Sequence, residues 1–371
     1  MCARVLLAGL LMAGAAFGDT AALTLAAPGS ADLFLTAPPN ALVRERRELP
    51  LSRGLNRLIF TWDRTNLDRN TVRLRPLAQP DQARVLARVL PPDRQDRVLF
   101  EVESAADGAA SFLVTYALRN VAWRPEYVAT LSPDSQRLDL DAVAVVSNDS
   151  GQPLRNVRLV LGSDEGRGGG ELPLPAGVVE IGQSVRVPYR HWAGLPMRQE
   201  YVVDDARYAN RAAIRLILEN APGAGLGTEP LIAGKLRVFQ ARPAAMPTLL
   251  AEDQLPATPL GEKSEILLGF VDELTLERKV VRSARFNERK DGKGAVVVYD
   301  LDEEIELKIE SRFDRPVETT IVEHPDGYWV LRDTKLPVLR RDANTLELRV
   351  QIEPQAVTRA RWRIEHRNLA P

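Results

Sequence analysis

Alternating carboxylates in one segment of this 371-residue chain could supply metal ligands. The segment YDLDEEIELKIE places Asp300, Asp302, Glu304 and Glu306 two residues apart, so a strand would set all four on one face. Calcium takes roughly six to eight oxygen ligands, and its sites usually gather them on a tight loop. A flat strand with Lys308 nearby is more typical of a solvated outer face. We therefore expect no metal site in this segment.

The three histidines, His191, His324 and His366, are the other groups suited to acid–base or metal chemistry. They are isolated in sequence, and no His-x-His or His-Glu-x-x-His spacing occurs. No Gly-x-Ser-x-Gly elbow marks a nucleophilic serine, and the glycine-rich residues 166–170 lack the Lys-Ser/Thr of a phosphate loop. The sequence thus predicts no catalytic residue, metal ligand or cofactor. A Ser-His-Asp triad assembled from distant positions stays open, because its members need not be close in sequence.

Aromatic residues beside rigid or charged neighbours are the candidate binding groups. Trp123, Pro125 and Tyr127 could form a stacking platform for a sugar or peptide; we favour the interpretation that they anchor a corner where the chain changes sheets. Residues 190–211 mix aromatics with paired charges, which fits either a recognition surface or a hairpin packed across a domain seam. The candidate binding residues are Trp123, Tyr127, His191, Trp192, Tyr201 and Tyr208.

Composition limits the partners of the chain. It has 49 Lys+Arg against 50 Asp+Glu and is 45% hydrophobic, which is typical of a globular protein. Phosphate binding requires a net basic face or tail, so the balanced charge argues against nucleic acid as a partner.

The N-terminus has the three parts of a secretory signal: Arg4, an apolar core, and small residues ending at Gly18. We predict that residues 1–18 are a signal peptide and that the mature protein is periplasmic or secreted. No stretch reaches the roughly 20 apolar residues of a membrane-spanning helix, so the mature chain is predicted not to span a membrane. The one cysteine, Cys2, would leave with the signal peptide, and the mature chain would then have no thiol or disulfide.

Period-two alternation through most of the chain predicts strands with one buried face. In the segment TLELRVQ, Leu346, Leu348 and Val350 alternate with polar residues, a pattern that favours antiparallel sheets. Turn sequences such as residues 148–151, Asn-Asp-Ser-Gly, separate the strands. The best helix candidate, residues 81–90, also fits a strand. We predict an all-β fold of tandem antiparallel β-sandwiches with a small N-terminal β module.

The length of the chain predicts several domains, because one sandwich usually takes on the order of 100 residues. The predicted parts are a signal peptide (1–18), an N-terminal β-rich module (19–97), a β-sandwich (98–220) and a C-terminal β-sandwich (221–371). Residues 162–177 and 241–260 are rich in glycine, alanine or proline, and we expect both to be surface loops.

Several motifs between residues 111 and 162 occur in a fixed order. Tyr116 stands on a predicted strand, and a Trp-x-Pro-x-Tyr step follows at residues 123–127. Next come the Asn-x-Ser-Gly turn of residues 148–151 and the Asn-Val-x-Leu strand of residues 156–159. This order resembles the C-terminal domain of the mucoidy-inhibitor-like bacterial family, and PLIAGKLRVFQ resembles its Leu-Pro-Ala-Gly strand entry. The stretch from residue 41 to residue 77 resembles the short N-terminal domain of that family.

Two departures from the family pattern matter. Residues 93–108 are too few for the long coiled coil that usually separates the two parts. Gln152-Pro153-Leu154 stands where the family usually has Glu-Asp-Trp. The resemblance implies a β-sandwich envelope protein with no established reaction.

These observations predict an exported, non-catalytic β-sandwich protein of the bacterial cell envelope that binds an envelope protein or glycan. The alternative is an envelope hydrolase acting on glycan or peptide. That alternative requires a cleft in which two carboxylates, or a histidine and a carboxylate, converge within hydrogen-bonding reach.

Overall fold

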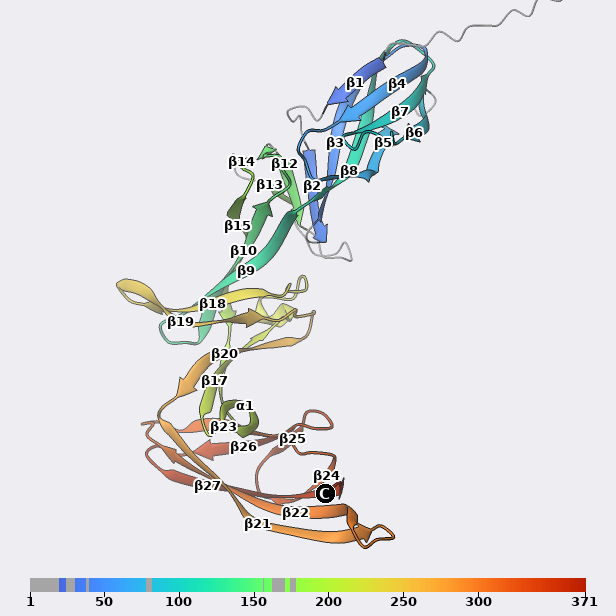
Figure 1. Ribbon diagram of the computed structural model, residues 1–371. Helices are drawn as coiled ribbons and strands as arrows, with labels where there is room; N and C mark the ends of the chain where they lie inside the picture. Colours follow the sequence, from blue (N-terminus) through green and yellow to red (C-terminus); the bar gives the residue numbers. More distant parts are fainter. Residues whose placement is uncertain are drawn as a thin grey trace, which may run out of the picture. The chain divides into compact units, whose positions relative to one another are not determined.

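The computed structural model describes residues 20–24, 31–37, 40–77, 82–155, 157–161, 171–173 and 178–371 (Figure 1). The predicted signal peptide, Asn156, residues 166–170 and most of the predicted loop 162–177 lie outside them. Strands dominate the described residues, beside one short helix, α1 (Asp205–Tyr208), and one 3-10 turn, η1 (Pro222–Ala224). The predicted all-β, sandwich-type fold is confirmed. None of the helices in the described ranges is long and apolar enough to cross a membrane.

The chain forms two compact units, each built from two segments. The first unit comprises Met1–Pro125 and Val143–Tyr189, and the second comprises Glu126–Ala142 and Arg190–Pro371. Three strands contribute residues to both units: β9 (Val121–Leu131), β10 (Arg137–Asn148) and β15 (Gln183–Pro196).

The predicted domain boundaries at 97/98 and 220/221 each fall inside one of these units. Strand β7 (Arg97–Ser104) pairs with β4 (Gly54–Thr61), and β17 (Ala212–Glu219) pairs with β20 (Lys263–Val271). Turn residues and composition mark where strands end. They do not show which distant strands share a sheet.

Two sheets lie wholly within the first unit, and their apolar faces meet where the ring of Phe60 lies 5.7 Å from that of Tyr116. The first sheet has the spatial order β1 (Thr20–Thr24), β4, β7, β6 (Ala83–Val89). The second has the order β13 (Glu171–Pro173), β12 (Val157–Leu161), β2 (Ala31–Ala37), β3 (Asn40–Leu51), β8 (Gly108–Arg119), β5 (Leu67–Pro76). A two-stranded ladder joins β11 (Leu154–Arg155) to β14 (Val178–Val179). The helix candidate at residues 81–90 is therefore the strand β6.

A further sheet has the order β15, β10, β9, β18 (Gly234–Arg242), β19 (Ala245–Leu255). Residues 241–260, expected to be a loop, instead contain β19, so that prediction was wrong. The strand lies at a sheet edge and its first half is largely exposed, with Met246 86% exposed. Its backbone pairing with β18, rather than a buried face, holds it in the sheet.

Two sheets of the second unit share one core. The first has the order β20, β17, β16 (Arg198–Asp204), β23 (Val317–Glu323), β26 (Leu346–Ile352), β25 (Val338–Arg340). The second has the order β21 (Leu274–Lys290), β22 (Val296–Ser311), β27 (Val357–Leu369), β24 (Tyr328–Thr334). Leu348, Ile305 and Trp362 belong to a single buried cluster, so the two sheets form a sandwich.

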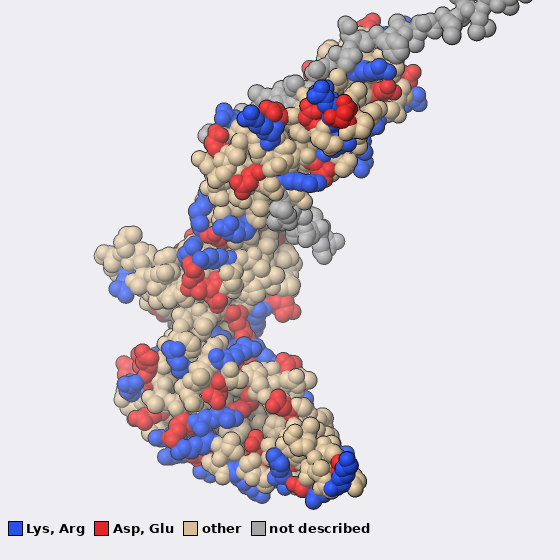
Figure 2. Space-filling model, viewed as in Figure 1, with Lys and Arg blue, Asp and Glu red and all other residues tan. Residues whose placement is uncertain are grey.

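Most strand pairs are antiparallel, but four of the described pairs are parallel: β1 with β4, β2 with β12, β9 with β18 and β16 with β23. Each joins strands far apart in sequence, as a parallel pair requires. Acidic and basic side chains are interspersed over the surface shown in Figure 2, consistent with the net charge of -1.

Candidate functional site

A charged pair occupies the core-facing side of β3. Ala41, Val43 and Leu49 on that side are buried, and the alternation of a strand places Glu45 and Arg47 in the same row. Their side chains are only 15% and 13% exposed. Removing an ion pair from water costs free energy that apolar residues would not cost. Core packing alone therefore does not account for this charged pair on β3.

Tyr116 completes a three-residue polar cluster with this pair. The Tyr116 hydroxyl donates to Glu45 Oε1 at 2.7 Å, and Arg47 Nε donates to Glu45 Oε2 at 2.8 Å. The register of β3 with β8 sets Tyr116 opposite Val43, one step along the same face from Glu45. Burial and the charge of Glu45 raise the pKa of Tyr116 well above its ordinary value. The phenol therefore remains a hydrogen-bond donor at any physiological pH.

A cavity of about 510 Å³ adjoins this cluster and has Glu45 and Tyr116 among its lining residues. Leu33, Leu118 and Leu154 contribute to its apolar walls. Its polar lining residues are Asp63, Arg64, Thr65, Gln152 and Arg155. Apolar walls with a few placed polar groups, at this volume, are typical of small-molecule and side-chain binding pockets.

The Asn-x-Ser-Gly turn builds one wall of the pocket. Asn148 and Ser150 are fully buried; the Asn148 amide donates to the carbonyls of Gln152 and Val179, each at 2.8 Å. Gly151 has φ +87°, and a Cβ at this position would lie 2.0 Å from the Arg64 carbonyl oxygen. Close packing against the loop at Arg64 therefore requires glycine here.

The arrangement is suited to binding a group that has an apolar body and a hydrogen-bond donor. A carboxylate offers about four acceptor positions. The described contacts of Glu45 use three, from the Tyr116 hydroxyl and from two guanidinium nitrogens of Arg47. One position remains for a ligand, and the apolar walls would surround the rest of it.

Two of the predicted binding residues, Trp123 and Tyr127, have structural positions on β9. Trp123 is 8% exposed, and its indole N–H donates to the Leu35 carbonyl at 2.6 Å. Tyr127 is 1% exposed, and its hydroxyl donates to the Ile232 carbonyl at 2.8 Å. Neither ring offers a free face, so the structure does not support them as a stacking platform for a ligand.

The other four predicted residues belong to the second unit and do not gather at one point. His191 and Trp192 lie on β15, where His191 Nδ1 is 2.7 Å from Asp141. Tyr208 belongs to α1 and stacks edge-on against Phe270. Tyr201, on β16, lines a polar hollow of about 660 Å³ with Arg198 and Arg315.

Two of the alternating carboxylates of β22 bind arginines of β27. Asp302 binds Arg363 through two contacts of 2.6 and 2.7 Å, and Glu306 accepts from Arg361 Nε at 2.6 Å. Within the described residues, no group of three or more His, Cys, Asp and Glu is arranged to hold a metal ion. Cross-strand arginines, rather than Lys308, thus balance these charges.

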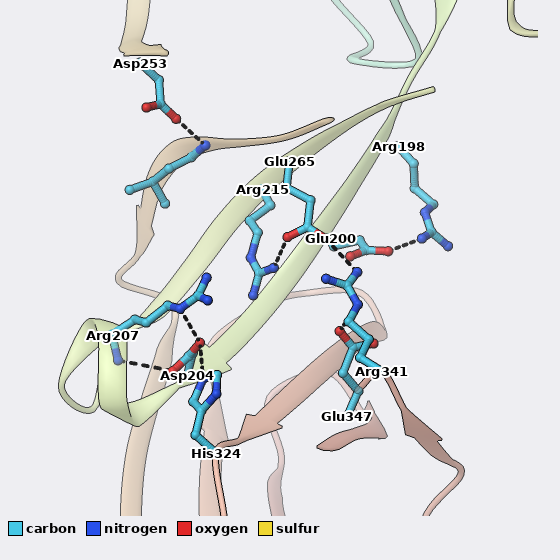
Figure 3. A network of polar contacts seen from close by, with 11 residues as sticks. Arg198, Glu200, Asp204, Arg207, Arg215, Asp253, Glu265, His324, Arg341 and Glu347 are labelled. Atoms are coloured by element: carbon cyan, nitrogen blue, oxygen red, sulfur yellow. Dashed lines mark hydrogen bonds and ion pairs between the residues drawn. The ribbon is translucent and has the colours of Figure 1, made fainter. Parts of the chain in front are cut away.

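A second polar cluster surrounds Asp204, at the start of α1 in the second unit (Figure 3). The buried Asp204 carboxylate accepts from the Arg207 backbone N–H and lies 3.1 Å from His324 Nε2. His366, in contrast, lies 3.2 Å from the Asp326 backbone carbonyl through Nδ1 and 3.7 Å from the Glu303 carboxylate through Nε2. Each histidine therefore has a different carboxylate partner, and in the described part of the chain no serine, threonine or tyrosine hydroxyl is bonded to any of them.

Figure 3 also shows a chain of charges that links three strands and a loop. Arg215 on β17 pairs with Glu265 on β20; Arg341 lies 2.6 Å from Glu265 and 2.8 Å from Glu347 on β26. Burial opposes the charge of Glu265, but the hydrogen bond from Arg341 holds its pKa below the ordinary value. Through Arg341, this chain links β20 to β26, which are not neighbours in the sheet.

Sequence reasoning missed Glu45, Arg47 and Tyr116 as a site. Two features could have indicated them: charged residues at the core-facing positions of ALVRERRELPL, and a tyrosine in the apolar row of a neighbouring strand.

Comparison of the chain with protein-family models and with curated proteins found no match.

Proposed function

We propose that the chain is an exported protein of the bacterial cell envelope that binds another envelope component without catalysing a reaction. The main support for binding is the Glu45–Arg47–Tyr116 cluster, which lies beside a largely apolar cavity of the first unit. The N-terminal sequence supports export, and the family resemblance supports an envelope role. The bound group is an apolar side chain or lipid-like moiety of that component, with an N–H or O–H that donates to Glu45.

A photo-crosslinking residue at Arg155, on the cavity lining, tests this function in cells that produce the full chain. We expect an adduct with an envelope component, and its loss in Val157→Trp, which fills the cavity from β12. Val160→Trp is the matched control, since Val160 lies on the opposite face of the same strand and does not line the cavity. An adduct that survives Val157→Trp, or the absence of any adduct, would contradict the proposal.

Export has its own test. Mass analysis of the chain recovered from producing cells should show an N-terminus at Asp19 and recovery with the periplasmic or secreted fraction. A cytoplasmic chain that retains residues 1–18 would overturn this part of the proposal.

The hydrolase alternative is favoured by one observation, the 3.1 Å contact between His324 and the buried Asp204. A histidine oriented by a carboxylate is the acid–base half of a catalytic triad. Incubation of the purified chain with peptidoglycan or peptide should give turnover that His324→Ala abolishes if this alternative holds. Equal or zero turnover in both proteins would eliminate it.

A further inference from the structure

Four arginines form two rows on the outer face of the second sheet of the first unit. The register sets Arg44 of β3 and Arg73 of β5 on either side of Thr115 of β8. The next row along the same strands consists of Arg46, Leu113 and Arg75. Neighbours along a strand are roughly 6.7 Å apart, and neighbours across β8 are roughly 9.5 Å apart. We call these two rows the arginine face.

The side chains of the arginine face point away from the core. All four arginines are exposed, whereas Val43, Val72 and Leu74 at the alternate positions are buried. Leu113 and Thr115 between the rows are half-buried. The result is a strip of half-buried residues with exposed arginines along both sides.

No carboxylate of the described residues forms an ion pair with any of these four arginines. Arg44 lies over the Phe34 ring, at 4.1 Å from its centroid. The cross-strand neighbour of Arg44 is Asp32, but Asp32 is bound by Arg158 at 2.9 Å. Like charges on adjacent positions of a sheet are destabilising. The arginine face therefore carries a charge repulsion that no ion pair within the described residues offsets.

An exposed edge strand often carries charge to prevent pairing with other chains. That explanation does not apply to Arg44 and Arg46, because β3 lies between β2 and β8. It applies to Arg73 and Arg75 only in part, since β5 is at the edge but their side chains project from the face.

We propose that the arginine face binds an acidic polysaccharide, with its carboxylates held by the guanidinium groups and its sugar rings lying along β8. Arginine presents a planar fork that matches a carboxylate in two parallel hydrogen bonds. The two rows of arginines repeat along β8, which suits a polymer with repeated charges. The arginine face has no exposed large apolar side chain to enter a membrane. Single-stranded nucleic acid would require free aromatic rings, and Arg44 covers Phe34.

The arginine face is separate from the pocket, because Arg44 and Arg46 lie on the side of β3 opposite Glu45. This inference therefore extends the proposed function to a second surface and does not depend on the first.

Binding of the full chain to polygalacturonate tests the proposal, with neutral dextran, polyphosphate and duplex DNA as comparison polymers. We expect salt-sensitive binding to polygalacturonate that is roughly tenfold weaker in Arg46→Gln/Arg75→Gln, since each substitution removes a charge-assisted pair. The matched control is Arg282→Gln/Lys290→Gln, which removes the same charge from two exposed basic residues of β21. A cooperative thermal transition at or above the wild-type melting temperature verifies that both double variants fold.

The control variant should retain affinity within about twofold, as should Val157→Trp in the pocket. Equal loss in the two double variants would show that net charge alone drives binding and would overturn the proposal. Equal binding to dextran, or tighter binding to polyphosphate or DNA than to polygalacturonate, would overturn the assignment of an acidic polysaccharide. Loss in Val157→Trp alone would assign the polymer to the pocket and would also refute it.

Discussion

At the scale of single residues, the most informative positions combine burial with a constraint that no other side chain meets. Glu45 is an acid in a row of apolar residues, and its carboxylate accepts hydrogen bonds from Tyr116 and Arg47. Gly151 is a glycine whose missing side chain leaves room for a carbonyl. Both belong to the pocket, so changing either one alters the shape or the polarity of the proposed site.

Gly151→Ala should lower the free energy of unfolding of the first unit by about 3 kcal/mol. Left-handed backbone costs an alanine roughly 1 kcal/mol, and displacing the Arg64 carbonyl adds the rest. Gly182→Ala is the control, because Gly182 also has positive φ but a Cβ added there would have no atom within 4 Å. Gly182→Ala should lower the free energy of unfolding only by the cost of placing alanine in the left-handed backbone conformation. Urea unfolding measures both, and equal effects would contradict the packing argument.

Tyr116→Phe should destabilise the protein by about 1 to 2 kcal/mol, because Glu45 loses a donor inside the pocket. The raised pKa of Tyr116 means that the folded state favours the neutral phenol. The stability that the Tyr116 hydroxyl contributes is thus complete below the pKa of about 10 that tyrosine has in the unfolded chain. This contribution is lost as the pH rises through the pKa of Tyr116 in the folded protein. Difference absorbance of the wild type against Tyr116→Phe checks this. A phenol that ionises near pH 10 would refute it.

At the scale of elements, ion pairs connect particular strands, whereas hydrophobic alternation alone does not determine which strands are neighbours. Glu365 on β27 accepts from Arg332 on β24 at 2.6 Å and from Arg367 at 2.7 Å. On the neighbouring strand β22, Asp302 and Glu306 accept from arginines of β27. These contacts fix which residues of β22, β27 and β24 lie opposite one another.

Glu365→Gln should weaken the second unit at neutral pH but not in strong acid. Hydrogen bonds from Arg332 and Arg367 lower the pKa of Glu365 to about 2. A depressed folded pKa contributes stability above the unfolded pKa of about 4.3, and this contribution fades as pH falls through the folded value. Partly exposed ion pairs are worth under about 1 kcal/mol, which bounds the loss.

Urea unfolding at pH 7, 4 and 2 measures this difference. Glu353→Gln, at an exposed glutamate just after the end of β26, should change little at any of these pH values. A difference between wild type and Glu365→Gln that was as large at pH 2 as at pH 7 would argue against the ion-pair explanation.

At the scale of the whole molecule, two compact units are built without any cysteine after residue 2. Stability must then come from core packing and strand pairing, even in an oxidising compartment where disulfides form. The shared core of the second unit, with Trp362 and Leu348 buried, shows one such source.

The unfolding temperature of the mature chain should be the same with and without a thiol reductant. A full-length Cys2→Ser variant should give the same mature protein, since the proposed removal of residues 1–18 would take position 2 with it. Differential scanning calorimetry checks both statements. A shift with reductant would mean that Cys2 remains in the protein and forms an intermolecular bond.

The strands and their buried faces could be predicted from the sequence, because period-two alternation is local. The predicted buried row of β26, Leu346, Leu348 and Val350, is confirmed. The pairing of β2 with β12, the division of β9 between two units, and the strand β19 in an expected loop emerge only from the tertiary structure. The pocket also emerges only from the tertiary structure, because Glu45, Tyr116 and Gly151 come from three distant segments of the sequence. Alternation tells which face of a strand is buried, whereas long-range pairing selects the neighbour against which it is buried.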